Sequence, residues 1–464
     1  MKKSILLNVD SYKVLMDKMY PDEITRVYSY IESRGGHFDK VLFFGLQMFI
    51  KEYLSKPITL SDIDEAEIVW NAHFGDSVFM RDKWERIVNK HDGRLPLIIR
   101  AIPEGTMIGV KNVLVTIENT DPACRWLTTW VETALLRAVW YPTTVATLSK
   151  HIKDMILSFL EETGDPSGID FKLHDFGARG ASSYETSGIG AVAHLVNFKG
   201  TDTIAGVLYA KEYYNEPMAG FSIPASEHSV ITAWGKEGEA DAYYNMLQKF
   251  GKPGKIFACV SDSYDIFNAA ENLWGESLRQ AVIDSGATVV IRPDSGDPET
   301  VIHALLETLG KKFGYTWNDK GYKVLNHVRL IQGDGVNYNA IQGILGLMKI
   351  YKWSADNIAF GMGGALLQAA QRDDQKFAMK ASAVFDRSRG EWIGIAKDPI
   401  TDFGKKSKQG RVTCYLDESN GLYYSDIEQT TKGAKRDALV TVYHNGFPQS
   451  QSTFAEIRAR SNKK

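Results

Sequence analysis

The stretch Val328-Arg-Leu-Ile-Gln-Gly-Asp334 is a short apolar run that ends in a polar turn containing glycine. Buried strands of a parallel sheet have this pattern, because helices cover both of their faces. Runs of this kind recur along the middle of the chain, at Phe171–Asp175, Ile256–Ser261, Thr288–Asp294, Val328–Asp334 and Asn357–Gly361. They predict the strands of one parallel sheet.

Helical patterns separate these runs, at Tyr264–Leu273, Thr300–Leu309 and Tyr338–Lys349. Strands that alternate with helices are typical of βα units, and a β/α barrel is the natural closure of such a series. In a barrel of this kind, functional residues follow the carboxyl ends of the strands. The polar turns that end these runs are therefore the first place to look for a site.

The chain on either side of this region has a different pattern. Before residue 150, strand-like runs such as Arg26–Ile31 and Leu97–Ala101 mix with helical stretches such as Asp62–Phe74. After residue 385 a hairpin is expected at Val412–Tyr424. We therefore expect a mixed α/β sheet domain to begin in residues 1–150, a barrel catalytic core in 151–384, and a C-terminal segment, 385–464, that returns to the sheet domain.

Composition narrows the class of partner. The chain has 464 residues and a formal net charge of −3, which offers no general attraction to nucleic acid or to an anionic membrane. No run approaches the roughly 18 apolar residues of a membrane-spanning helix. Cys124, Cys259 and Cys414 are far apart and form no CxxC pair, which fits a reducing compartment. We expect a cytoplasmic protein with small-molecule partners and no nucleic-acid or membrane partner.

Two glycine-containing turns have features of a sugar-phosphate site. In Phe360-Gly-Met-Gly-Gly-Ala365 the backbone N–H groups of Gly363 and Gly364 could meet a phosphate, with Arg372 downstream. In Gln332-Gly-Asp-Gly335, the Asp334 carboxylate could accept two ribose hydroxyls. Plain turns without a ligand are the alternative for both.

Charged residues at a further strand end and in one loop add to this pattern. Arg292 suits a pyrophosphate, and Asp294 suits a sugar hydroxyl or a magnesium ion. A structural salt bridge between the two is the alternative. The basic loop Gly404–Arg411, with Lys397 before it, is either a substrate contact or an ordinary solvated surface.

His228 is a candidate nucleophile or base. It stands in a short polar loop, with Glu227 and Asp265 as possible acidic partners, although a structural loop histidine is the alternative. The Gly188-Ile-Gly190 segment does not follow a buried strand, so it does not indicate a dinucleotide site. The sequence contains no Walker A, HExxH, EF-hand or GxSxG motif.

Taken together, the motifs resemble those of the nicotinamide phosphoribosyltransferase family. Eight of them occur in the same order between Asp10 and Arg411: Asp10-Ser-Tyr-Lys13, His174-Asp-Phe-Gly-Ala-Arg-Gly180, Gly200-Thr-Asp-Thr203, Pro224-Ala-Ser-Glu-His228, Val260-Ser-Asp-Ser-Tyr-Asp265, Arg292-Pro-Asp-Ser-Gly296, Gln332-Gly-Asp-Gly335 and Gly363-Gly364. The resemblance implies an irregular type II phosphoribosyltransferase-like barrel, a mixed sheet domain, and a homodimer with shared active sites.

The same resemblance implies roles for individual residues. Phe176 and the partner subunit's Tyr12 would stack on the nicotinamide ring, and Asp202 would accept a hydrogen bond from its carboxamide. The remaining substrate-binding residues that it implies are Asp10, Arg34, Arg179, Ser222, Ser261, Arg292, Asp294, Gly333, Asp334, Gly363, Gly364, Arg372, Lys380, Lys397 and Lys405. Two positions depart from the family pattern: Ala178 replaces an aromatic residue usual in the vertebrate members, and Ala378 replaces a serine that usually helps to hold the 5′-phosphate.

The implied reaction joins nicotinamide to the ribose of phosphoribosyl pyrophosphate, with Mg²⁺ held mainly by the substrate's pyrophosphate. By resemblance, ATP hydrolysis is coupled through phosphorylation of His228, which Asp265 would orient and Glu227 would flank. The nearest rival is nicotinate phosphoribosyltransferase, but Asp202 would repel a second carboxylate. A non-catalytic protein that kept the fold is the rival from another class, and intact His228, Arg292 and Asp294 argue against it.

Overall fold

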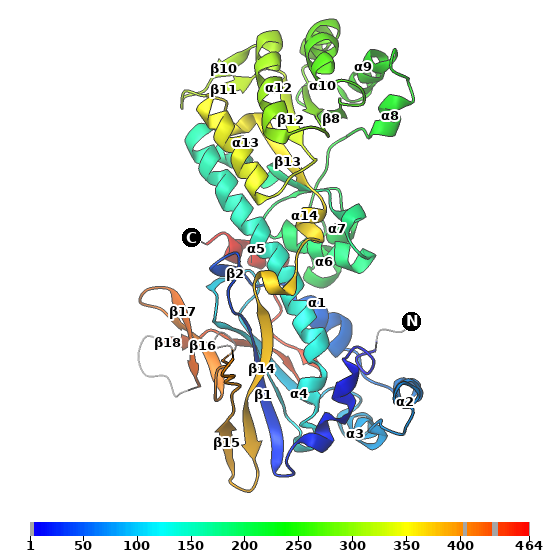
Figure 1. The fold of residues 1–464 in the computed structure, drawn as a ribbon, viewed down its shortest axis with the longest axis vertical. Helices are drawn as coiled ribbons and strands as arrows, with labels where there is room; N and C mark the ends of the chain where they lie inside the picture. Colours follow the sequence, from blue (N-terminus) through cyan, green and yellow to red (C-terminus); the bar gives the residue numbers. More distant parts are fainter. Residues whose placement is uncertain (1–3, 402–405, 429–434, 464) are drawn as a thin grey trace. The chain divides into compact units, whose positions relative to one another are not determined.

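A computed structural model describes residues 4–401, 406–428 and 435–463 (Figure 1). They form two compact units. The first, here called the sheet unit, comprises the described residues among 1–147, 213–215 and 371–464, and the second, the barrel unit, comprises 148–212 and 216–370. The division at 147 falls inside the long helix α5 (Glu132–Thr163). It lies close to the division at 150 expected from the sequence.

The sheet unit is built on a seven-stranded antiparallel sheet with strand order β15-β14-β1-β5-β3-β19-β20. Its strands are β1 (Ile24–Ser33), β3 (Leu97–Ala101), β5 (Val113–Asn119), β14 (Phe377–Asp386), β15 (Glu391–Gly394), β19 (Val440–His444) and β20 (Phe447–Pro448). Strands from both ends of the chain thus share one sheet. The predicted boundary at 384 cuts through β14, which pairs with β1 along its length, so the barrel ends earlier than expected, at residue 370.

Smaller elements complete the sheet unit. Its helical segments are η1 (Ser11–Met19), α1 (Leu46–Phe49), η2 (Ile50–Leu54), α2 (Leu60–Phe74), α3 (Arg81–His91), η3 (Pro122–Cys124), α4 (Leu127–Trp130), η8 (Arg372–Asp374) and α15 (Phe454–Ser461). Its minor sheets pair β2 (Lys40–Leu42) with β4 (Met107–Gly109), and β16 (Val412–Asp417) with β17 (Leu422–Ile427) and β18 (Lys435–Asp437).

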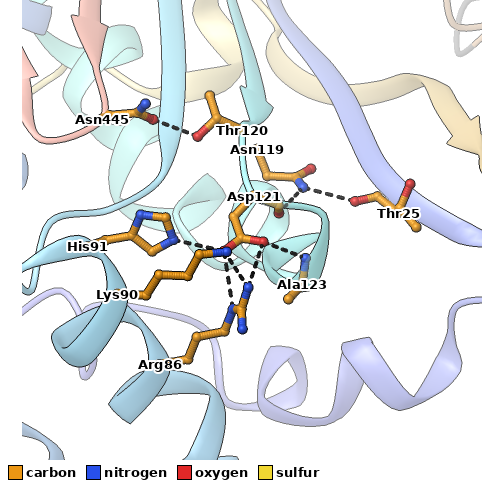
Figure 2. A network of polar contacts seen from close by, with 9 residues as sticks. All are labelled: Thr25, Arg86, Lys90, His91, Asn119, Thr120, Asp121, Ala123 and Asn445. Atoms are coloured by element: carbon orange, nitrogen blue, oxygen red, sulfur yellow. Dashed lines mark hydrogen bonds and ion pairs between the residues drawn. The ribbon is translucent and has the colours of Figure 1, made fainter.

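A buried carboxylate ties α3 to the loop after β5. Asp121 accepts hydrogen bonds from Arg86, His91 and the backbone N–H of Ala123, as Figure 2 shows. Burial acts to raise the pKa of the Asp121 carboxyl, but the bonds from these three partners outweigh it and hold that pKa well below the usual range. Every oxygen of this carboxylate has a protein partner, so the cluster is structural.

The barrel unit contains a six-stranded, entirely parallel sheet with strand order β7-β6-β13-β12-β9-β8. The strands are β6 (Leu173–Asp175), β7 (Gly200–Thr201), β8 (Ile256–Val260), β9 (Thr288–Arg292), β12 (Val328–Gln332) and β13 (Ile358–Met362). Five of them coincide with the five apolar runs of the sequence. The sixth, β7, is only two residues long and was not predicted.

One extended segment closes this sheet. Phe221 exchanges backbone hydrogen bonds with Lys199 (2.7 Å) and Thr201 (3.0 Å) beside β7, at one edge of the sheet. A few residues later, the N–H of Ala258 in β8, at the other edge, donates to the carbonyl of Pro224 (2.9 Å). Residues 221–226 therefore bridge the two edge strands, and the predicted α/β barrel is confirmed as an irregular one.

Helices surround the barrel strands, as the alternation in the sequence predicts (Figure 1). They are η4 (Pro166–Phe171), η5 (Ala178–Gly180), α6 (Tyr184–Leu195), α7 (Ile204–Tyr214), α8 (His228–Thr232), α9 (Glu239–Phe250), α10 (Ile266–Asn268), η6 (Ala269–Ser277), α11 (Arg279–Ser285), α12 (Pro298–Phe313), α13 (Tyr338–Ile350), η7 (Ala355–Asn357) and α14 (Gly364–Leu367). A two-stranded sheet, β10 (Tyr315–Trp317) and β11 (Lys323–Leu325), follows α12. Gly188 and Gly190 lie inside α6, in agreement with the absence of a dinucleotide loop there.

Candidate active site

The candidate site of the barrel unit is at the carboxyl ends of its strands. Since all six strands are parallel, the turns that follow them meet at one end of the barrel. These turns carry Phe176 after β6, Asp202 after β7, Asp262 after β8, Asp294 after β9, Asp334 after β12 and Gly363 after β13. The structure thus brings together residues spread over nearly 200 positions of the sequence.

The aromatic ring of Phe176 lies on two glycines. A Cβ atom placed on Gly361 would be 1.9 Å from Phe176 Cε2, and one on Gly333 would be 3.4 Å from the same atom. The ring is half-buried and contacts an apolar cluster of Ala258, Val290 and Ile331 inside the barrel. These glycines leave the space that fixes the ring at the barrel end.

Asp202 follows β7, the strand that pairs with β6. Its backbone N–H donates to the carbonyl of Asp175 (3.0 Å), the residue before Phe176. Its side chain is exposed, and the hydroxyl of Ser222, from the closing segment, donates to Asp202 Oδ1 (2.5 Å). The structure therefore brings two predicted residues together and holds one carboxylate in a defined position.

Asp175 is a buried carboxyl that the sequence interpretation missed. Burial raises its pKa to about 6, although hydrogen bonds from the Gly177 N–H and from the hydroxyl of Thr201 oppose that rise. The negative charge of Asp202 raises it further. Asp175 fixes the turn that carries Phe176, because its Oδ1 accepts the Gly177 N–H at 2.7 Å.

Arg292 and Asp294 are neighbours at the end of β9. A guanidinium nitrogen, Nη2, of Arg292 is 3.6 Å from Asp294 Oδ2, so the ion pair considered from the sequence is present. The pair leaves Arg292 Nε buried and without a hydrogen-bond partner among the described residues. Asp294 also lies beside Gly333, whose added Cβ would be 3.2 Å from Asp294 Oδ1. The Nε–H group of Arg292 is therefore a hydrogen-bond donor at the barrel end that no described residue accepts.

His228 is the first residue of α8, and its side chain is 44% exposed. Its Nε2 lies 2.9 Å from Oδ1 of Asp262, which follows β8. Glu227 precedes the helix, and its carboxylate accepts a hydrogen bond from the Ser229 hydroxyl. The imidazole is therefore oriented by a carboxylate and still accessible.

Two expectations about this region are wrong. Asp265 does not orient His228, because its Oδ1 accepts the backbone N–H groups of Phe267 and Asn268 (3.0 Å each) and so caps α10. Ser261 is fully buried, and its hydroxyl donates to the Cys259 carbonyl and accepts from the Trp274 indole. Its side chain therefore stabilises the barrel wall and is not available to a substrate.

The loop after β6 packs against the start of α14. A Cβ on Gly180 would lie 3.1 Å from the Cα of Gly364, and one on Gly177 would lie 3.0 Å from the carbonyl oxygen of Gly363. This loop carries Arg179, whose side chain is exposed. Arg179, Gly363 and Gly364 are thus close in space. Asp334 is exposed at the neighbouring strand end.

The remaining predicted residues lie in the sheet unit. The Thr133 hydroxyl donates to Asp10 Oδ2 (2.6 Å), and Tyr12, in η1, is 63% exposed. Arg34 donates to Glu32 (3.1 Å) but keeps a buried Nη2 without a partner among the described residues. Arg372 pairs only locally, with Asp373 (3.1 Å). Lys405 lies outside the described residues.

Lys380 belongs to a basic cluster of the sheet unit. Burial lowers the pKa of Lys380, and although Glu132 opposes this, the charges of Arg34, Lys397 and Lys13 lower it further. Two of these cations already have carboxylate partners, since Lys13 Nζ lies 2.5 Å from Glu132 Oε2 and Arg34 Nε lies 3.1 Å from Glu32 Oε1. The substrate-binding roles expected for Arg34, Lys380 and Lys397 stay predictions.

Comparison with known proteins identifies the family. The profile of the nicotinate phosphoribosyltransferase (NAPRTase) family matches residues 171–446, and that of the nicotinamide phosphoribosyltransferase N-terminal domain matches residues 4–99. A nicotinamide phosphoribosyltransferase of Xanthomonas campestris is 51% identical over 99% of this chain and 98% of that protein. The chain belongs to the nicotinamide phosphoribosyltransferase family. A second member, from Mycoplasma genitalium, is 32% identical over 88% of this chain and 94% of its own length.

Two solved structures have a fold similar to that of this chain. A nicotinate-nucleotide pyrophosphorylase from Pyrococcus furiosus has a TM-score of 0.63 at 17% identity, covering 99% of this chain and 97% of its own. Human nicotinic acid phosphoribosyltransferase has a TM-score of 0.54 at 15% identity, covering 97% and 92%. The shared fold is that of type II phosphoribosyltransferases, as the resemblance in the sequence predicted, and the protein is a pentosyltransferase.

Two further observations concern membranes and metals. Across residues 4–401, 406–428 and 435–463, no helix is long and apolar enough to span a bilayer. Over the same ranges, the structure contains no group of three or more His, Cys, Asp or Glu side chains that could hold a metal ion.

Proposed function

We propose that the protein transfers the phosphoribosyl group of phosphoribosyl pyrophosphate to nicotinamide, forming nicotinamide mononucleotide and pyrophosphate. The observation that carries the proposal is the Asp202 carboxylate, which Ser222 holds in the turn after β7, next to the turn after β6 that carries Phe176. A carboxylate accepts a strong hydrogen bond from an amide NH₂, and an aromatic ring stacks on a pyridine. The nicotinamide phosphoribosyltransferase names of both relatives support the same substrate.

Nicotinate is the competing substrate, because the NAPRTase family profile covers residues 171–446. Its carboxylate would face that of Asp202, and two like charges at hydrogen-bond distance repel strongly. The nearby Asp175 carboxyl, with its pKa raised by burial, offers no positive charge to relieve this repulsion. The electrostatics of the site therefore favour the amide over the acid.

The reaction breaks the bond between ribose C1 and the pyrophosphate oxygen and forms a bond from C1 to the pyridine nitrogen. Positive charge develops on the ribose ring and negative charge on the leaving group, so positioning and electrostatics do most of the catalytic work. Arg292, with its unpartnered Nε, and Arg179 suit the departing pyrophosphate. Asp294 and Asp334 suit the ribose hydroxyls, and Gly363 and Gly364 suit the 5′-phosphate.

Magnesium fits this chemistry as a companion of the substrate. A pyrophosphate supplies oxygen ligands that Mg²⁺ prefers, and Asp294 is the side chain of the barrel end best suited to add one. Bound there, Mg²⁺ would neutralise charge on the leaving group.

ATP hydrolysis is proposed to act through His228. A lone pair of the imidazole would attack the γ-phosphorus of ATP, forming an N–P bond as the bond to the ADP oxygen breaks. The accessible ring and its contact with Asp262 support a nucleophile of this kind. Phosphohistidine would add negative charge near the pyrophosphate site and so alter substrate binding.

A homodimer is proposed to complete the site. The exposed Tyr12 ring, preceded by the fixed Asp10, would cover the second face of nicotinamide in the partner subunit. Each active site would then take its two aromatic faces from different chains.

A single assay tests the reaction and its substrate. Purified protein is incubated with phosphoribosyl pyrophosphate, Mg²⁺ and either nicotinamide or nicotinate, with and without ATP, and the mononucleotide is quantified. Product from nicotinamide at a much higher kcat/KM than from nicotinate supports the proposal. A preference for nicotinate would replace it with the acid-specific reaction.

A further inference from the structure

Asp262 connects two parts of the barrel end that the sequence does not join. It directly follows Ser261 at the end of β8, and its side chain is only 5% exposed. Oδ1 of its carboxylate contacts Nε2 of His228 at 2.9 Å. Oδ2 accepts the backbone N–H of Asp294 (3.1 Å) and the hydroxyl of Ser295 (2.6 Å). The two oxygens of this buried carboxylate therefore contact different parts of the barrel end. Oδ1 contacts His228, and Oδ2 contacts the loop of Asp294 and Ser295.

The carboxylate is charged in this environment. Burial acts to raise its pKa, but the hydrogen bonds from Ser295 and His228 outweigh that effect and hold the pKa of Asp262 below its usual value. A buried carboxylate that loses one partner must recover hydrogen bonds elsewhere, because leaving a charge unsatisfied is costly. A change in the contact with His228 therefore changes the hydrogen bonds that Asp262 accepts from the backbone N–H of Asp294 and the hydroxyl of Ser295.

We propose that Asp262 is the positioning residue through which the phosphorylation state of His228 is transmitted to the loop that carries Asp294. This inference rests on the proposed function. Unphosphorylated imidazole pairs with Asp262 Oδ1. When Nε2, the nitrogen that contacts Oδ1, carries the phosphoryl group, it no longer donates to that oxygen, and the added negative charge repels the carboxylate. The carboxylate then shifts its hydrogen bonding toward Asp294 and Ser295, which places the Asp294 side chain for the ribose hydroxyls.

The test compares the KM for phosphoribosyl pyrophosphate without ATP and with saturating ATP. We expect wild-type protein to show a lower KM with ATP. In Asp262→Asn the ratio of the two KM values should fall to about one, while His228 still acquires acid-labile phosphate from γ-labelled ATP. Ser295→Ala, which removes one bond to Oδ2 and leaves His228 untouched, should lower the ratio partly. It also serves as the deciding variant if Asp262→Asn does not fold.

Asp297→Ala is the matched control. Asp297 belongs to the same loop, but its carboxylate caps α12 by accepting the Thr300 N–H (3.0 Å). The variant removes this helix cap without touching Asp262, so it should keep the wild-type ratio of KM values. If Asp262→Asn that carries the label, or Ser295→Ala, kept the wild-type ratio of KM values, this inference would be wrong. The phosphohistidine proposal would still stand. Wild-type protein that acquires no label and shows no ATP effect would overturn the phosphohistidine proposal and this inference together.

Discussion

The ring of Phe176 occupies the space that the missing side chain of Gly361 leaves. A Cβ on Gly361 would lie 1.9 Å from Phe176 Cε2, closer than any two carbon atoms can approach without a bond. The ring contacts the apolar cluster inside the barrel on the same side. The position of the proposed stacking surface for nicotinamide therefore depends on a residue with no side chain.

Gly361→Ala should displace the Phe176 ring and raise the KM for nicotinamide by about tenfold, since overpacking of this kind costs about 1–3 kcal/mol. Gly346→Ala is the control, because an added Cβ on Gly346, in α13, meets no atom within 4 Å. Steady-state kinetics on both variants provide the measurement. Equal KM values for Gly361→Ala and the control would show that the ring position does not limit nicotinamide binding.

Asp202→Asn should narrow the preference for nicotinamide over nicotinate by about tenfold or more, because a hydrogen bond to a charged group contributes about 1.5–3 kcal/mol. The ratio of kcat/KM for the two substrates measures the effect. Ser222→Ala frees the carboxylate but keeps its charge. It should therefore raise the KM for nicotinamide while the amide stays preferred. Full discrimination in Asp202→Asn would assign selection to another residue.

Subunits inactivated at different positions should complement each other if the active site is shared. Tyr12→Ala and Asp294→Ala change residues of different units, and a mixed dimer would contain one site with both native residues. We expect activity to return to about a quarter of wild type when equal amounts exchange subunits, because half of the dimers are then mixed and each mixed dimer has one native site of two. No recovery after exchange is verified by differently tagged chains would rule out a composite site.

His228→Ala should abolish ATP hydrolysis and leave slow mononucleotide synthesis, because Arg179, Arg292 and the aspartates of the barrel end remain. Wild-type protein should carry acid-labile, base-stable phosphate after incubation with γ-labelled ATP. Thermal melting serves as the control, since a merely structural histidine would lower both activities in parallel with stability. A well-folded His228→Ala protein that still acquired the label would disprove the assignment.

Asp175 predicts a pH-dependent stability. Its pKa is about 6 in the folded protein against 3.8 for an unperturbed carboxyl, so the folded state binds its proton more tightly than the unfolded state. The stability that this group contributes is complete below about pH 3.8 and is lost as the pH rises through about 6. The side chain of Asp175→Asn cannot ionise. The Tm of this variant minus that of wild type should therefore increase as the pH rises from about 4 to 7.

Asp284→Asn, an exposed carboxyl of α11, is the reference for this comparison. Its Tm is followed over the same pH range as a reference for the change of one carboxyl to an amide. A Tm difference for Asp175→Asn that stayed constant with pH would mean that Asp175 ionises normally in the folded protein.

Local patterns along the chain predicted most of the barrel. The runs ending at Asp175, Ser261, Asp294, Asp334 and Gly361 became strands, because a parallel strand covered by helices must be apolar along its length. The same reasoning placed Arg292, Asp294 and Asp334 at one end of the barrel, whereas Phe176 and Asp202 were expected there only from the resemblance to the family. It missed β7, which is too short to have a pattern, and β14, whose place in the sheet unit comes from pairing with β1.

The amino-acid sequence alone determined which chemical groups follow each strand, since strand direction and a turn settle that locally. Only the tertiary structure decided which of those groups meet. Asp262 and Asp265 lie three residues apart in one motif, yet one contacts His228 and the other caps α10. Ser261, beside them, points into the barrel wall. Such choices depend on side-chain direction at the end of a strand and on the segment 221–226 that closes the barrel, and both follow from packing between residues distant in the chain.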